Sequence, residues 1–157
     1  MSRWVLSVER RIAAPADEIY AVVADPDRHR DFDGSDALRG VAEASSPARP
    51  LVVGDHFSMN MDLRGQYVMT STVVEAEPGR RFAWQSRPHK SSARWRSAFG
   101  GRIWRYELEP DGGTTLVRES WDLTEEPLRV VVGLGRPVAR DAMTASLERL
   151  ARLVERS

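Results

Sequence analysis

Between residues 56 and 123, apolar and polar side chains alternate in successive short runs, and turn residues separate the runs. The first run, over residues 57–63, carries Phe, Met, Met and Leu at every second position and ends before Gly65. The same period returns in the runs that follow, up to Leu123. This is the period of a strand with one buried face, so the pattern predicts consecutive antiparallel strands.

A strand and two short helical segments are predicted before this stretch. Apolar residues alternate with polar ones over 4–12, which predicts a first strand with Arg10 on its apolar face. Pro15 suits the first turn of a helix, and the acidic residues that follow it suit the positive helix end. We expect this helix to end near Asp25-Pro26 and a second helical turn to reach Phe32, before a turn at 33–35.

A long amphipathic helix is predicted at the C-terminal end. Met143, Leu147, Leu150 and Val154 recur at spacings of four, three and four, which places them on one helical face. No repeat or linker divides the sequence, so we expect a single domain over residues 1–157. Strand, short helices, several strands and a terminal helix form an α+β order.

The charge balance and the absence of cysteine exclude several classes of binding partner and of chemistry. The chain has 23 basic and 23 acidic residues, and this balance argues against nucleic acid or an anionic membrane as the main partner. It has no cysteine, which removes disulfides and thiolate chemistry. Charges interrupt the apolar residues of the N-terminus, so we expect no signal peptide, no membrane insertion and a cytoplasmic protein.

Three stretches carry a resemblance to a known family: PADEIYAVVADPDR at 15–28, EPGRRF at 77–82 leading into Trp84, and the Gly112-Gly113-Thr114 hairpin. Together they resemble the START-like, or helix-grip, superfamily and its polyketide cyclase/dehydrase (SRPBCC) branch. The resemblance implies a seven-stranded curved antiparallel sheet wrapped around the C-terminal helix, with a cavity between them. Members range from cyclases to lipid carriers, hormone receptors and chaperone activators, so it predicts fold more sharply than function.

The sequence departs from that branch at two places, and we expect a further irregularity in the last strand. His29 stands where relatives often carry a second aromatic residue in the short helix, and the segment over 87–102 reads as a long loop. Leu116 and Val117 are both apolar and cannot both face inward in a regular strand, so we expect an extra residue, a bulge, in the last strand.

The hairpin over residues 104–123 places a carboxylate among aromatic side chains. If its loop is even, Trp104, Tyr106 and Leu108 share a face with Thr115, Val117, Glu119 and Trp121. An odd loop would instead turn Leu116, Arg118, Ser120 and Asp122 inward, and this more polar face is disfavoured. An inward Glu119 must be paired, protonated or wetted, and we expect Arg10 to be its partner. The pair could be structural, a polar anchor for a ligand, or a general acid or base.

Large apolar side chains on predicted inward positions suggest a cavity wall, although packing against the terminal helix would also explain them. Methionine walls adapt to irregular apolar ligands. The predicted ligand-binding residues are Met59, Met61, Tyr67, Met69, Trp84, Trp104, Tyr106, Glu119, Trp121, Met143 and Leu147.

Other constellations are weak. His29, His56 and His89 lack the spacing of a histidine metal site and are expected at the surface, and the aspartates between residues 31 and 36 fit turns. No nucleophile elbow or complete dinucleotide fingerprint occurs. We therefore expect no metal and no cofactor.

Three functions remain open. The first is binding of a small, mostly hydrophobic molecule, aromatic or polyketide-like, by a monomer or homodimer. The second is a polyketide aromatase/cyclase or dehydratase, in which Glu119, Arg10 or Tyr106 assists proton transfer. The third is a co-chaperone-like interaction module that uses the outer sheet face or the loop over 87–102.

Overall fold

The computed structural model describes residues 2–36, 38–41, 49–62, 65–88 and 99–155. Within them, seven strands form one antiparallel sheet in the order β1-β7-β6-β5-β4-β3-β2. The strands are β1 (Val5–Ile12), β2 (Leu38–Val41), β3 (His56–Asp62), β4 (Gln66–Glu77), β5 (Arg81–Pro88), β6 (Arg102–Asp111) and β7 (Thr114–Asp122).

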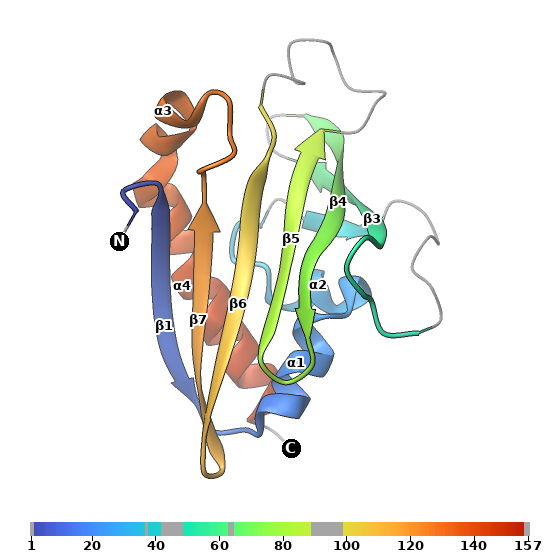
Figure 1. The fold of residues 1–157 in the computed structure, drawn as a ribbon, viewed down its shortest axis with the longest axis vertical. Helices are drawn as coiled ribbons and strands as arrows, with labels where there is room; N and C mark the ends of the chain where they lie inside the picture. The colour runs from blue at the N-terminus through green and yellow to red at the C-terminus, as the bar shows by residue number, and fades with distance from the viewer. Residues whose placement is uncertain (1, 37, 42–48, 63–64, 89–98, 156–157) are drawn as a thin grey trace.

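Short helical segments and one long helix complete the fold. They are α1 (Ala16–Val23), η1 (Pro26–Arg28), α2 (His29–Phe32), α3 (Arg129–Val132), η3 (Gly133–Gly135) and α4 (Arg136–Val154). Figure 1 shows α4 running diagonally behind β1, β7 and β6, and α4 contacts β1, β7 and α2. This architecture confirms the predicted α+β helix-grip fold. None of the described helices combines the length and the apolar character that a membrane crossing needs.

The β6–β7 hairpin has the predicted even loop. Asp111 pairs with Thr114 across two glycines, and Gly112 adopts the positive φ of 64° that such a turn favours. Tyr106 therefore opposes Glu119, and the inward face predicted for both strands is confirmed. The bulge expected in the last strand is wrong, because β7 pairs without a shift along its whole length.

Leu116 accommodates this regular pairing by lying half-buried on the side opposite the fully buried Val117. The register shifts of the sheet occur instead in β2, between Leu38 and Gly40, and in β4, between Val73 and Glu75. Bulges bend and twist a strand, so both shifts contribute to the curvature of this half of the sheet.

The packed core lies between the sheet and the helices. Ile12, Ile19, Phe82 and Leu150 are at most 1% exposed and belong to the main cluster, to which α4 contributes its apolar stripe. Burial of that stripe is what holds α4 against the sheet.

Candidate ligand-binding cavity

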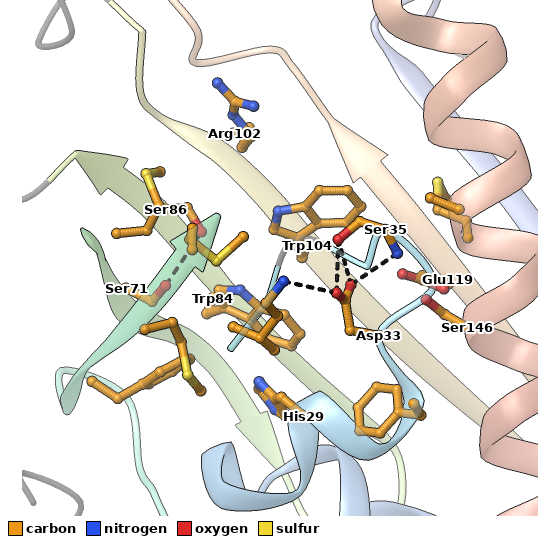
Figure 2. Close-up of a pocket in the computed structure, with 18 of the residues that line it drawn as sticks. His29, Asp33, Ser35, Ser71, Trp84, Ser86, Arg102, Trp104, Glu119 and Ser146 are labelled. Carbon is orange, nitrogen blue, oxygen red and sulfur yellow. Dashed lines mark hydrogen bonds between the residues drawn. The ribbon is translucent and has the colours of Figure 1, made fainter. Parts of the chain in front are cut away.

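The concave side of the sheet, the α2–β2 connection and α4 border a partly open cavity of about 690 Å³. This volume lies within the usual range of small-molecule sites. Figure 2 shows side chains from strands on both halves of the sheet pointing into the space that α4 borders on one side.

Nine of the eleven side chains predicted to bind a ligand line this cavity. Trp121 and Leu147 do not line it, and both are buried in the packed core. Trp121 stacks behind Trp104, with ring centroids 6.1 Å apart. The nine are Met59, Met61, Tyr67, Met69, Trp84, Trp104, Tyr106, Glu119 and Met143.

Other lining residues escaped sequence reasoning. Several are short or polar and several lie in connections, where no periodic pattern marks the inward side. The additional residues are His29, Phe32, Asp33, Ser35, Leu38, Phe57, Ser71, Ser86, Pro88, Phe99, Arg102, Ala142 and Ser146.

Stacked rings build one wall of the cavity. The Trp84 indole stacks with the His29 imidazole, with centroids 4.8 Å apart, and with the Tyr106 ring, with centroids 6.0 Å apart. Phe57 meets the same indole edge-on at 6.1 Å. These ring contacts fix the indole against its neighbours and present a flat apolar surface.

His29 is buried, so its predicted surface position is wrong. Its Nε2 lies 2.7 Å from the Val23 carbonyl oxygen, which can only accept, so Nε2 donates and Nδ1 is left as an acceptor. Burial lowers the pKa of His29, which keeps the ring neutral at pH 7. His56 is exposed and bonds to Thr72, and His89 lies outside the described residues.

Glu119 is a buried acid at the inner side of the cavity, 3% exposed. Burial raises its pKa to about 8, the negative charge of Asp33 adds to the rise, and a hydrogen bond from the Tyr106 hydroxyl opposes it. Burial and the neighbouring Glu119 raise the pKa of Tyr106 well above its usual value. The Oε2 atom of Glu119 has no hydrogen-bond partner among the described residues.

The expected ion pair between Arg10 and Glu119 is wrong. Arg10 is exposed and lies opposite Val117, whereas the β1 neighbour of Glu119 is Val8. Because β1 is an edge strand, the long side chain of Arg10 can reach water although its position belongs to the inward-facing series. Glu119 is therefore a protonated acid below about pH 8, and among the residues that the structure describes it has no ion-pair partner.

A tight connection between α2 and β2 supplies more polar groups. The Asp33 carboxylate accepts hydrogen bonds from the backbone and hydroxyl of Ser35 and from the Leu38 N–H. Gly34 donates to the Ser146 hydroxyl of α4 at 2.8 Å. Figure 2 shows Asp33, Ser35, Glu119 and Ser146 grouped on the α4 side.

Arg102 lies elsewhere on the cavity wall, at the start of β6. Its Nε donates to the Glu126 carboxylate at 2.8 Å, and the Gly100 N–H donates to the same group at 2.9 Å. Glu126 is fully buried. It therefore holds the chain that enters β6, but most of the loop predicted over 87–102 lies outside the described residues.

Comparison with known proteins identifies the family. The family model described as polyketide cyclase / dehydrase and lipid transport matches residues 3–155. The chain belongs to this family. An uncharacterized Mycobacterium tuberculosis protein, Rv0088, is 42% identical over 113 residues, covering 71% of this chain and 44% of that protein. The chain thus spans under half the length of the curated relatives it matches.

Solved structures agree with the fold. A Chromobacterium violaceum protein, CV1439, superposes with a TM-score of 0.71 at 19% identity and covers 96% of this chain and 97% of its own. A START superfamily protein from Mycobacterium smegmatis gives 0.70 at 17% identity, with 97% of each chain covered.

In this member of the polyketide cyclase / dehydrase and lipid transport family, the cavity combines a mostly apolar wall with one neutral acid. Below pH 8 the Glu119 carboxyl can donate one hydrogen bond and accept others, with no charge to be neutralised. Glu119 thus adds hydrogen-bonding capacity to a mostly apolar wall.

Proposed function

We propose that the protein binds a small, mostly hydrophobic molecule, aromatic or polyketide-like, in the cavity between the sheet and α4. The observation that carries this proposal is the cavity of about 690 Å³ walled by aromatic and methionine side chains. A solid interior would bury the same residues without leaving this volume, so packing alone does not account for it.

The polar groups suggest the shape of the ligand. A carbonyl or hydroxyl oxygen on the ligand would pair with the protonated carboxyl of Glu119, while an apolar ring system would lie against Trp84. A buried polar group without a partner is costly, and a ligand oxygen that reached Oε2 would remove this cost.

Titration with N-phenyl-1-naphthylamine, a neutral dye that fluoresces in apolar surroundings, tests the proposal. We expect the wild-type protein to bind one dye molecule and Met61→Trp, which fills part of the cavity, to bind it at least about tenfold more weakly. Val68→Trp is the matched control, since Val68 lies between two cavity residues of β4 and faces the other side.

The comparison of the two variants decides the outcome. Unchanged binding in Val68→Trp together with weaker binding in Met61→Trp supports the cavity. Absence of dye binding by the wild-type protein, or equal losses in both variants, contradicts it. Native mass spectrometry of protein from its own host would then identify the natural ligand.

A second candidate is a polyketide cyclase or dehydratase that uses the same cavity. The unpartnered Oε2 of Glu119 favours it, since an acid with a pKa near 8 can transfer a proton at neutral pH. Tyr106 would orient the carboxyl, and Arg10 has no part because it is exposed. A Glu119→Gln variant that binds a polyketide-like substrate but no longer converts it would support this candidate, and unchanged conversion would exclude Glu119 as the acid.

A further inference from the structure

A surface outside the cavity carries exposed apolar side chains next to arginines, at α3, η3 and the start of α4. We propose that this surface docks on an anionic lipid membrane without crossing it. We call it the α3 patch; its apolar members are Leu128, Val130, Val131, Leu134 and Val138.

The apolar part of the α3 patch is concentrated and strongly exposed. Leu134 is 79% exposed, Val138 74% and Val130 66%. Of the seven exposed large apolar residues in the described part of the chain, five belong to this patch, and the other two are Val52 and Val53. Scattered apolar side chains need no explanation, but a cluster of this kind marks an interaction site.

Inside the patch segment the charges have one sign, although the exposed Glu125 stands just before it in the chain. Residues 127–140 contain Arg129, Arg136 and Arg140 and no acidic residue, although the whole chain has no net charge. The exposed Asp141 ends this segment. A locally basic surface therefore exists although the net charge of the chain is zero.

Three guanidinium groups lie around the Trp4 ring. Those of Arg3, Arg129 and Arg136 lie 4.8, 5.3 and 5.6 Å from its ring centre. In the regions that the structure describes, none of these arginines, nor Arg140, forms an ion pair with a carboxylate. Three positive charges around one ring, with no paired carboxylate in the described regions, favour an anion from outside the chain.

An anionic bilayer can interact with both the apolar side chains and the arginines of the α3 patch. Aliphatic side chains can enter the boundary between headgroups and acyl chains, arginines can pair with lipid phosphates, and a partly exposed Trp4 suits the same depth. A second copy of the chain would bring two arginine clusters together, and nucleic acid would leave the valines and leucines in water. Lipid is therefore the partner that the surface fits.

The position of the patch agrees with docking by one end of the molecule. Figure 1 shows α3 beside the N-terminus, at the end of the sheet where β7 finishes and β6 begins. Arg102 of the cavity wall lies at the same end of the sheet. A molecule resting on this end would place the start of α4 at the membrane surface and keep the strands and the rest of α4 away from the membrane interior.

Vesicle co-sedimentation of the full chain tests the proposal. We expect binding to vesicles of phosphatidylcholine with about 30% phosphatidylglycerol, weaker binding as salt rises, and little binding to phosphatidylcholine alone. Each arginine near an anionic surface changes affinity by about fivefold, so Arg129→Gln with Arg140→Gln should weaken binding by about 25-fold. Arg39→Gln, at an exposed position on β2, is the matched control.

A second pair of variants tests the apolar half. Leu134→Asp with Val138→Asp should abolish binding, whereas Val53→Asp should leave it unchanged, and urea unfolding checks that each variant is folded. Salt-insensitive binding to both kinds of vesicle, or no vesicle binding at all, overturns the proposal. So does a wild-type dimer in sedimentation that the double aspartate variant loses, or binding to a DNA duplex in place of vesicles.

Discussion

Glu119 lies directly across the β6–β7 ladder from Tyr106, and the tyrosine hydroxyl hydrogen-bonds to its carboxyl group. Both side chains are 3% exposed. Because the two strands keep one register from hairpin to end, the acid is held at one place in the cavity wall. Because its pKa is about 8, the Glu119 carboxyl is protonated in a solution at pH 7, and this protonation has measurable consequences.

Stability should depend on pH through Glu119. Its pKa of about 8 in the folded protein lies above the value of about 4.3 in an unfolded chain, so the folded state holds the extra proton between these values. The free energy of unfolding should therefore fall by several kcal/mol as pH rises from about 4.5 to 8 and then level off, at about 1.4 kcal/mol per pKa unit.

Urea unfolding at pH 5, 7 and 8.5 measures this dependence. Glu119→Gln, which cannot titrate, should lose much less stability over the range, and Glu109→Gln, at an exposed site in the same hairpin, should behave like the wild type. Parallel curves for the wild type and Glu119→Gln would show that the buried acid does not titrate as described.

Tyr106→Phe should raise the pKa of Glu119 further. The hydroxyl hydrogen bond favours the carboxylate, and its removal leaves burial and Asp33 unopposed. The loss of one hydrogen bond should also cost about 1 kcal/mol of stability. Carbon-13 NMR of the Glu119 carboxyl during a pH titration measures the shift, and a lower pKa in the variant would refute the hydrogen bond.

Gly34→Ala should separate the α2–β2 connection from α4. A Cβ atom there would lie 2.0 Å from the Ala142 carbonyl oxygen and 2.7 Å from the Ser146 nitrogen, and both belong to backbone. We expect a loss of about 2–4 kcal/mol in urea unfolding. Gly113→Ala, where a Cβ meets nothing within 4 Å, should change stability by under about 1 kcal/mol. Equal effects of the two changes would contradict the close approach.

Glu126→Ala should be strongly destabilising. The carboxylate is fully buried and holds Arg102 and the Gly100 N–H, so its removal leaves both without their partner. We expect a cost of about 3–5 kcal/mol. Glu125→Ala, one residue earlier and exposed, loses only a hydrogen bond from Gln85 and should cost about 1 kcal/mol or less. Thermal unfolding of the two variants side by side measures the difference.

The fold could be predicted from the sequence because the alternation of apolar and polar residues that marks its strands is a local pattern. Alternation with period two marks strands, and the two glycines of the β6–β7 hairpin fix which residues face inward. The expected bulge was wrong because Leu116 tolerates a half-buried place on the outer face. β2 has only four residues, too few for its alternation to be recognised.

The residues that line the cavity could be predicted from sequence only where they lie on strands or on the long helix. Eight strand residues followed from inward parity and Met143 from the helical stripe, but Asp33 and Ser35 reach the cavity from a connection, where parity says nothing. The burial of His29 depends on how α2 packs, and the only signal was the resemblance, which implied an aromatic residue at this position. Arg10 was misplaced because an edge strand lets a long side chain turn to water.

The most direct test of the central claim is methyl NMR of the methionines during titration with naphthalene. Met59, Met61, Met69 and Met143 line the cavity from two strands, β3 and β4, and from helix α4. The ring current of an aromatic ligand bound there would shift their methyl resonances. We predict saturable shifts for these four methyls and none for the exposed valines at 52 and 53. Four unmoved methionine resonances, at naphthalene concentrations up to its solubility, would contradict a ligand-binding cavity.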